Sequence, residues 1–224
     1  MKKKIKHLFP IACFVSGIIL IISVGYQIYC EPYHEADKRN HFEDMLIDGY
    51  MDEKAEIPDE APSDEAPLVE YQYSDVNDYS FRGHIDCILV IDKINMKKAV
   101  IRGNTLDDND FNLSKYYFVT ADLSTTLKGN YIIYGHSSQT YGHSFNRLDE
   151  MNVDDTFYVI QGNTRYSYKV EAVDRVLRLK SDAYFPHDVG KRVTLVACEK
   201  NLAAGYSEKR IIIVRAVQMR EEKI

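Results

Sequence analysis

The fold is decided by the stretch from Lys191 to Val217, KRVTLVACEKNLAAGYSEKRIIIVRAV, close to the end of the 224-residue chain. It holds two β-rich runs separated by loop-forming residues. The first run, 193–198, is apolar and partly β-branched, which favours a buried strand ending on Cys198. The second run opens on Arg210. If the two strands pair antiparallel, the end of one lies beside the start of the other, and Cys198 and Arg210 share one rim of the sheet.

Short β-rich runs alternate with turn formers from Gly83 to the C-terminus. Eight runs have strand character: 85–91, 98–102, 116–120, 130–135, 156–161, 165–178, 193–198 and 210–217. Dipeptides such as Gly129-Asn130 and Gly162-Asn163 separate neighbouring runs. Short helical turns are expected at 106–113 and 145–151. The sequence therefore predicts an all-β domain over residues 83–224, a closed barrel of roughly 140 residues with short helices.

The first 29 residues have the pattern of a membrane anchor. Residues 1–7 contain four lysines, and residues 8–29 contain no charged residue. As a helix these 22 residues would span about 33 Å, close to a hydrocarbon core of roughly 30 Å. The lysines favour a cytoplasmic N-terminus, which predicts a single-pass protein of the cell membrane with an extracellular domain. A cleaved signal peptide is the alternative, but the bulky residues 26–30 disfavour cleavage there.

Residues 30–82 have the composition of an acidic extracellular stalk. Between positions 31 and 80 there are sixteen acidic residues against three basic ones, and 58–67 form the near-repeat PDEAPSDEAP. Such a segment cannot bury enough apolar surface to offset its ordering entropy. Phe42, Met45 and Leu46 nevertheless lie at helical spacing and end near Gly49. They predict one short amphipathic helix in the stalk that packs on the domain or frays.

The composition argues against several kinds of site. The four cysteines show no CxxC pair and no regular spacing, so neither a metal site nor a disulfide framework is indicated. A bridge between Cys87 and Cys198 remains an alternative. The net charge of −6 and the lack of a basic stripe outside the N-terminus argue against nucleic acid as a partner. We expect no cofactor and no metal.

Cys198 becomes a candidate nucleophile if an imidazole lies near it, because the thiolate is the reactive form of cysteine. The domain offers four histidines: His84, His136, His143 and His187. The tetrapeptide YGHS occurs at 134–137 and again at 141–144, but only His136 directly follows a predicted strand and a glycine that lets the chain turn. If that strand runs parallel to 193–198, both strands end at one rim. His136, Cys198 and Arg210 would then converge.

These three residues and their surroundings resemble the sortase family of bacterial cysteine transpeptidases. The matching motifs are NYIIYGH at 130–136, TLVAC at 194–198 and EKRIIIV at 208–214, and IDKINMKKAV at 91–100 is similar to the family's first strand pair. The resemblance covers residues 83–224. It implies an eight-stranded barrel and a reaction in two steps, in which a thiolate attacks a sorting-signal peptide and an amine then takes the acyl group from the thioester.

The resemblance also implies a role for each residue. Cys198 matches the nucleophile, His136 the acid and base, and Arg210 the residue that binds substrate and stabilises the tetrahedral oxyanion. A guanidinium suits this role because it stays cationic and donates from a fixed fork. The implied partners are the sorting signal of a secreted surface protein and an amine of the cell envelope, such as a peptidoglycan precursor. Arg215 competes with Arg210, but it lies five positions further along and on the opposite face.

The sequence departs from the family pattern at Ala197, where the family commonly has threonine. The segments around 134–136 and 108–111 resemble class B of the family, whereas the connection 180–192 is short for that class's extra helix and 208–210 resembles class A. Two other functions stay open. One is a thiol protease that releases its product to water. The other is a non-catalytic barrel that binds peptides at the cell surface.

Overall fold

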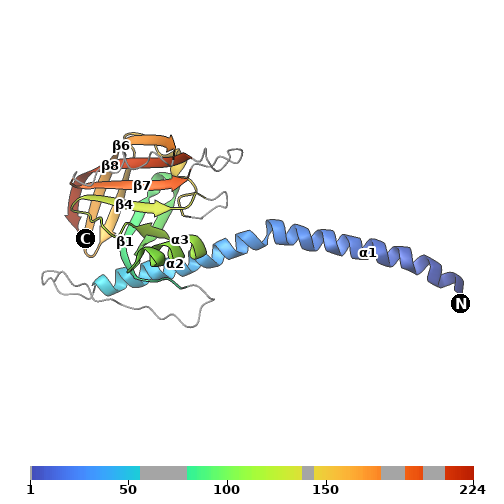
Figure 1. Cartoon of the computed structure of the whole chain (residues 1–224). Coiled ribbons are helices and arrows are strands. Elements are labelled where there is room, and N and C mark those ends of the chain that lie inside the picture. The colour runs from blue at the N-terminus through green and yellow to red at the C-terminus, as the bar shows by residue number, and fades with distance from the viewer. Residues whose placement is uncertain (1, 56–79, 138–143, 178–189, 199–209) are drawn as a thin grey trace.

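The computed structural model describes residues 2–55, 80–137, 144–177, 190–198 and 210–224 (Figure 1). Eight strands close into a barrel: β1 (His84–Ile91), β2 (Met96–Arg102), β3 (Val119–Ala121), β4 (Asn130–Gly135), β5 (Thr156–Gln161), β6 (Thr164–Leu177), β7 (Arg192–Cys198) and β8 (Arg210–Lys223). All eight predicted strands are present. The prediction of a closed all-β barrel is confirmed.

The strands follow the order β1-β2-β3-β4-β7-β8-β6-β5 around the barrel, and β5 pairs with β1 to close it. Strands β7 and β8 are antiparallel, whereas β4 and β7 are parallel. Both pairings meet the conditions under which His136, Cys198 and Arg210 are expected to converge. Because a parallel pair ends at one edge and an antiparallel neighbour begins there, the end of β4, the end of β7 and the start of β8 meet at the same rim.

Side chains alternate between the two faces of each strand, and the barrel interior takes one set. In β7 the inward residues are Val193, Leu195 and Ala197, all buried. Their neighbours in the same apolar cluster come from every other strand of the barrel and include Leu89, Val100, Val119, Ile133, Val159, Tyr168 and Val214. The short runs of apolar residues in the sequence thus build one continuous core.

Helix α3 (Leu106–Tyr116) is longer than the helical turn predicted at 106–113. Its start is fixed by a capping box, in which the Thr105 hydroxyl accepts from the Asp108 amide and the Asp108 carboxylate accepts from the Thr105 amide. Because α3 continues to Tyr116, the strand predicted at 116–120 begins only at Val119. Two single-turn 3-10 helices, η1 (Asp92–Ile94) and η2 (Leu148–Glu150), complete the barrel, the second inside the turn predicted at 145–151.

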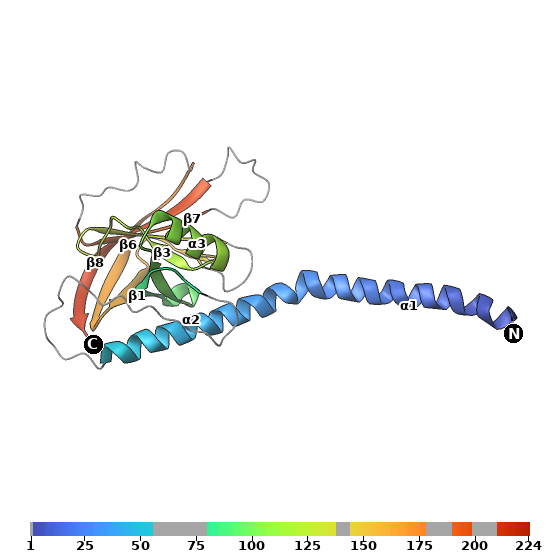
Figure 2. The same cartoon turned by 60° about the horizontal axis from the view of Figure 1, so that its bottom comes forward.

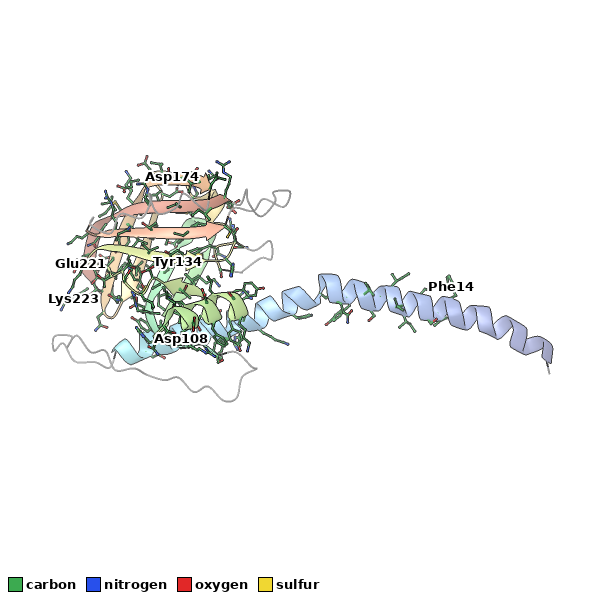
Figure 3. All side chains as sticks on the ribbon, viewed as in Figure 1. Phe14, Asp108, Tyr134, Asp174, Glu221 and Lys223 are labelled. Atoms are coloured by element: carbon green, nitrogen blue, oxygen red, sulfur yellow. The ribbon has the colours of Figure 1, made fainter. Side chains whose placement is uncertain are left out.

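The N-terminal part forms two consecutive helices, α1 (Lys2–Tyr29) and α2 (Glu31–Ala55). Helix α1 projects away from the barrel, and α2 runs along the barrel wall (Figures 1 and 2). The side chain of Phe14 and its apolar neighbours on α1 extend into open space (Figure 3). In the part of the chain that the structure describes, no helix is both long enough and apolar enough to cross a membrane.

One face of α2 is buried against the barrel. Its buried residues recur every three or four positions: Arg39, Phe42, Glu43, Leu46, Ile47 and Tyr50. The apolar ones pack with Ile88 of β1, Ile101 of β2 and Phe118. Residues 31–55 of the predicted stalk therefore form a helix packed on the domain, longer than the short helix that the sequence suggested. Residues 56–79 of that stalk lie outside the described residues.

Candidate active site

The register of the strands places the three predicted site residues at one rim. Gly135 pairs with Ala197 in the parallel β4–β7 ladder, so His136 and Cys198 occupy the next positions on adjacent strands. Cys198 pairs with Ile211 in the antiparallel β7–β8 ladder, so Arg210 lies one residue beyond its partner. Adjacent strands are about 4.8 Å apart. The three strands lie side by side in Figure 1, with β7 in the middle.

Cys198 lies on the outer face of the barrel wall. It alternates with the inward-facing Ala197 and shares its face with Val196, which packs in a small apolar cluster with Ile132, Ile211 and Ile213. The thiol is free and half-buried. A nucleophile in this position is reachable from outside the barrel while one side of it rests on apolar neighbours.

The departure from the family pattern at Ala197 affects the interior of the barrel. Its side chain is 3% exposed and belongs to the cluster inside the barrel. A threonine hydroxyl at this position would enter that apolar interior, on the face opposite Cys198. The methyl group of Ala197 therefore contributes to the core behind the thiol, and the substitution leaves the outer face of β7 unchanged.

Gly135, the last residue of β4, leaves room for the Phe145 ring directly before His136, and its backbone is that of an ordinary strand residue. A Cβ atom on Gly135 would lie 2.6 Å from Cδ2 of Phe145, a distance that packed atoms cannot adopt. The Phe145 ring is fully buried, and the Phe145 amide donates a hydrogen bond of 2.9 Å to the His136 carbonyl. Phe145 thus holds the backbone of His136 from beneath, and only a glycine before the histidine leaves room for the ring.

The His136 imidazole is half-buried against Tyr117. The two ring centroids are 5.5 Å apart, and the planes cross at 63° in an edge-to-face contact. Burial lowers the pKa of His136 below its ordinary value, because the charged form loses hydration. The neutral imidazole therefore predominates at pH 7. A neutral imidazole can accept a proton and release it again within one reaction cycle.

Arg210 is exposed at the same rim, and its Nη2 donates a 3.0 Å hydrogen bond to the Arg175 carbonyl of β6. This contact holds the guanidinium on the β6 side of β8. The competing Arg215 has a different role. Its Nε and Nη2 both donate to Asp174 of β6, at 3.2 and 2.9 Å, in the middle of the barrel wall. Arg215 is therefore a structural ion-pair residue, on the same face of β8 as Ile211 and Ile213. Arg210 is the arginine at the rim, and the alternation of β8 sets it on the face of Ile212, opposite the face that Cys198 shares with Ile211.

The remaining candidate residues do not meet Cys198. His84 opens β1, which lies four positions from β7 in the barrel order, and burial lowers its pKa. His143 and His187 fall outside the described residues. The Cys87 thiol is fully buried, 3.4 Å from the Tyr131 hydroxyl, and burial raises its pKa well above the ordinary value. Because Cys87 and Cys198 are both free, no bridge joins them.

Two further residues lie beside the site. Tyr117, which no sequence motif contains, touches His136 from the end of α3. Ser144, the last residue of the second YGHS tetrapeptide, donates its hydroxyl to the Tyr117 carbonyl. A β-bridge also pairs Ser144 with Ser137, the residue after His136. The contacts of Tyr117 with His136 and with Ser144 join positions that are 19 and 27 residues apart in the sequence. Predicting these contacts requires knowing that α3 ends at a left-handed residue. The sequence gives no such signal, because Tyr117 and not a glycine stands at that position.

A cavity of about 760 Å³ lies between α2, the β1–β2 wall and the segment 144–147, so Ser144 is one of its lining residues. Asn40, Asp44, Asp92, Lys97 and Tyr158 are among its lining residues, and Cys198, His136 and Arg210 are not. Within the described ranges, no group of three or more His, Cys, Asp or Glu residues could hold a metal ion.

The fold and the site define a class of protein in which a closed β-barrel carries cysteine, histidine and arginine at the ends of three neighbouring strands. A family model described as the sortase domain matches residues 89–218, more than half of the chain. The chain belongs to the sortase family, whose members are cysteine transpeptidases. The Asn130–Gly135, Arg192–Cys198 and Arg210–Lys223 strands that carry the three candidate residues all lie within or across this match.

Individual relatives agree with the family match. Sortase A of Bacillus anthracis is 23% identical over 198 residues, which cover 88% of each chain. Among solved structures, sortase A of Listeria monocytogenes has a TM-score of 0.52 at 17% identity, covering 62% of this chain and 90% of its own. The SrtA sortase of Actinomyces oris has a TM-score of 0.51 at 21% identity, covering 72% and 89%. These structures support the fold.

The subclass within the family stays a prediction. The extra helix that would separate class B would fall in the connection 180–192, of which 180–189 lies outside the described residues. The same holds for 138–143 and 199–209, which flank His136 and Cys198. The class B resemblance therefore rests on the sequence motifs alone.

Proposed function

We propose that this protein is a membrane-anchored cysteine transpeptidase that cleaves the C-terminal sorting signal of secreted proteins and transfers the acyl group to an amine of the cell envelope. The observation that carries the proposal is the register of β4, β7 and β8. It supports one rim on which Cys198, His136 and Arg210 act together, with Cys198 on the central strand.

In the first half-reaction the Cys198 thiolate attacks the carbonyl carbon of the scissile peptide bond. The carbonyl oxygen becomes an oxyanion. Arg210 lies one residue beyond the partner of Cys198 on the adjacent strand, and its guanidinium would leave the Arg175 carbonyl and turn toward the oxyanion to stabilise it. His136 takes the proton of the Cys198 thiol as the thiolate forms, and gives that proton to the leaving amine nitrogen as the C–N bond breaks. The products are a thioester on Cys198 and a free amine that carries the rest of the sorting signal.

In the second half-reaction an acceptor amine attacks the thioester carbonyl. The neutral His136 takes a proton from the attacking nitrogen, and the C–S bond breaks to return the thiolate of Cys198. One amide bond has then been exchanged for another without net consumption of water. A sheltered thioester would favour amine over water, and the apolar cluster of Val196, Ile211 and Ile213 beside Cys198 supports such shelter.

The proposed location is the cell membrane, with the N-terminus in the cytoplasm and the barrel outside. Support comes from the four lysines in residues 1–7 and the 22 uncharged residues at 8–29, which fall within one continuous helix. The acceptor amine would then be a peptidoglycan precursor at the outer face of the membrane. A full-length protein that fractionates with soluble proteins after expression would contradict this part of the proposal.

The central experiment is to trap the acyl intermediate. The purified full-length chain is incubated with a panel of sorting-signal peptides, and intact-protein and peptide mass spectrometry locate the adduct. We expect an acyl group on Cys198, its transfer to added amine nucleophiles, and no adduct on a Cys198→Ala variant. Cys30→Ser removes an exposed thiol outside the barrel and is the matched control. Undiminished cleavage by Cys198→Ala contradicts the proposal.

The same experiment separates the alternatives. A thiol protease would form the Cys198 adduct but give only the hydrolysed product, whatever amine is added. A non-catalytic peptide-binding barrel would bind the peptide and form no adduct at all. Transfer to an amine in preference to water distinguishes the transpeptidase from both.

A further inference from the structure

We propose that Tyr117 is a positioning residue, which holds the imidazole of His136 at the rim beside Cys198. The inference rests on the proposed function for the role of His136, and adds a residue that none of the sequence motifs contains. The first observation is the backbone conformation of Tyr117.

Tyr117 adopts a left-handed conformation, with φ of 58° and ψ of 27°. This region disfavours side chains with a Cβ atom, and at the end of a helix it is usually filled by glycine. The hydrogen bonds around Tyr117 are those of such a helix end, because the Phe118 amide donates to the Asn112 carbonyl at 3.2 Å. A bulky aromatic residue thus stands where glycine would be less strained.

Backbone strain of this kind persists where the side chain has a role or the surroundings impose it. Tyr117 is 40% exposed, so its ring is not needed to fill the core. The neighbours Tyr116 and Phe118, in contrast, are 8% and 1% exposed. The contacts that the Tyr117 ring makes outside the core therefore account for a tyrosine at this position.

The ring touches the imidazole of His136 edge to face, with 5.5 Å between centroids. The backbone of Tyr117 is also held. The Ser144 hydroxyl donates to the Tyr117 carbonyl, and Ser144 forms a β-bridge with Ser137. The peptide that follows His136 and the residue that packs on its ring are thus tied to each other through Ser144. His136 is constrained at both its backbone and its side chain.

Helix α2 contacts the Tyr117 ring through Arg39. The guanidinium carbon of Arg39 lies 6.0 Å from the centroid of the Tyr117 ring, within the range of a cation–π contact. Arg39 is 4% exposed and is part of the buried face of α2. The order Arg39, Tyr117, His136 therefore connects the N-terminal helix with the rim of the barrel.

The consequence for catalysis is geometric. His136 must reach the Cys198 thiol on the next strand and the leaving nitrogen of the substrate, and a ring packed against one edge of the imidazole limits its rotation toward other orientations. Burial lowers the pKa of His136, and the Tyr117 ring is one of the groups that cover the imidazole. Loss of the ring should change both the rate and the titration of His136.

The left-handed backbone makes a clean test possible. Tyr117→Gly removes the ring and relieves the backbone, so Tm should stay the same or rise. Tyr117→Phe keeps the ring and should retain wild-type kcat. Lys191→Gly is the matched control, because Lys191 is also left-handed, with φ of 56°, and precedes β7 at the end opposite Cys198.

Each full-length variant is assayed for kcat and KM with a sorting-signal peptide and an amine, for Tm, and for the NMR titration of the His136 ring. For Tyr117→Gly we expect kcat to fall by about ten- to a hundredfold with KM little changed. The pKa of His136 should rise toward its ordinary value, since water regains access. Lys191→Gly should show wild-type kcat and an unchanged His136 titration.

The inference is overturned if Tyr117→Gly turns over at the wild-type rate, or if kcat falls while the His136 titration is unchanged. It is also overturned if Tyr117→Phe loses as much activity as Tyr117→Gly, because the ring would then not be the group that matters. These outcomes differ from failure of the proposed function, in which the wild-type protein itself forms no acyl adduct on Cys198. The His136 titration is measured without substrate and gives a result in either case.

Discussion

Gly135 of β4 lies directly opposite Ala197 of β7 in a parallel pair of strands. The residues that follow them, His136 and Cys198, therefore meet at one rim although they are 62 positions apart in the sequence. Both small residues are buried, Ala197 in the barrel interior and Gly135 under the Phe145 ring. The position of the candidate catalytic pair is thus set by packing behind it.

Gly135→Ala should damage both stability and activity. The new Cβ would lie 2.6 Å from Cδ2 of the buried Phe145 ring, so the ring or the β4 backbone must move. We expect a loss of about 1–3 kcal/mol in the free energy of unfolding, measured by urea denaturation, and a lower kcat because His136 follows directly. Gly190→Ala is the control, since its Cβ would meet only the Lys128 carbonyl at an ordinary 3.4 Å. Equal stability of the two variants would contradict the packing argument.

Arg210→Ala should reduce turnover without unfolding the barrel. The guanidinium is exposed, and its hydrogen bond to the Arg175 carbonyl is replaceable by water. If Arg210 stabilises the oxyanion, kcat/KM with a sorting-signal peptide should fall by about 100- to 1000-fold while Tm changes little. Arg220→Ala removes an exposed arginine from the far part of the same strand and should leave kcat/KM unchanged. A comparable loss in both variants would indicate a general charge effect.

Tyr131→Phe should lower the stability of the barrel, whereas Tyr168→Phe should not. Both rings are fully buried in the barrel, and the Tyr131 hydroxyl donates to Asp86. The Tyr168 hydroxyl is buried too, but none of the described residues lies within hydrogen-bond distance of it. We expect Tyr131→Phe to lose about 1–2 kcal/mol and Tyr168→Phe to be neutral or slightly stabilising, by chemical denaturation. A marked loss in Tyr168→Phe would reveal a partner for its hydroxyl.

The ion pair between Glu43 and Lys98 should be decisive for the docking of α2. Glu43 Oε2 accepts from Lys98 Nζ at 2.6 Å, Oε1 accepts from the Ala99 amide at 3.2 Å, and the two charged side chains are 4% and 11% exposed. Glu43→Leu leaves a buried ammonium and should cost about 3 kcal/mol. The exposed pair of Lys169 with Asp154 is the control, and Lys169→Ala should cost less than about 1 kcal/mol.

A double variant tests the same pair further. Glu43→Leu combined with Lys98→Met replaces both charges, so its stability should return toward wild type compared with Glu43→Leu alone. Hydrogen exchange of the α2 amides would show whether the loss is local or global. Additive losses in the two single variants would mean that the pair contributes nothing specific to docking.

Stability should fall as the solution is acidified below the ordinary pKa of histidine. Burial lowers the pKa of both His84 and His136 in the folded protein, so near pH 6 the unfolded chain binds more protons than the folded one. The contribution of the two neutral histidines to the free energy of unfolding is complete above pH 6.5. It is lost as the pH falls through their folded-state pKa values. Thermal unfolding between pH 5 and 8 on the buffered full-length chain measures this slope. His84→Phe should make it shallower, and an unchanged slope would exclude His84 as a cause.

The sequence was sufficient for the elements of the barrel. Alternating apolar runs and turn dipeptides are local signals, and they predicted all eight strands. The antiparallel pairing of 193–198 with 210–217 and its parallel pairing with 130–135 were conditions for the site, and the structure shows both. They also singled out His136, Cys198 and Arg210, because strand ends are visible in a sequence once the strands are known. The end of α3 was harder to predict, since Tyr117 occupies a position where a glycine would have marked it.

Only the tertiary structure decided what surrounds the three residues. Residues 31–55 looked like part of a charged stalk because their composition is acidic, yet Phe42, Leu46 and Ile47 form one buried face that gains its partners only from β1, β2 and Phe118. The same is true of Tyr117 on His136, of Phe145 under Gly135, and of Ala197 pointing away from Cys198. Periodicity along a chain determines which residues share a face, whereas which faces meet depends on how distant segments pack, and the chain alone does not state this.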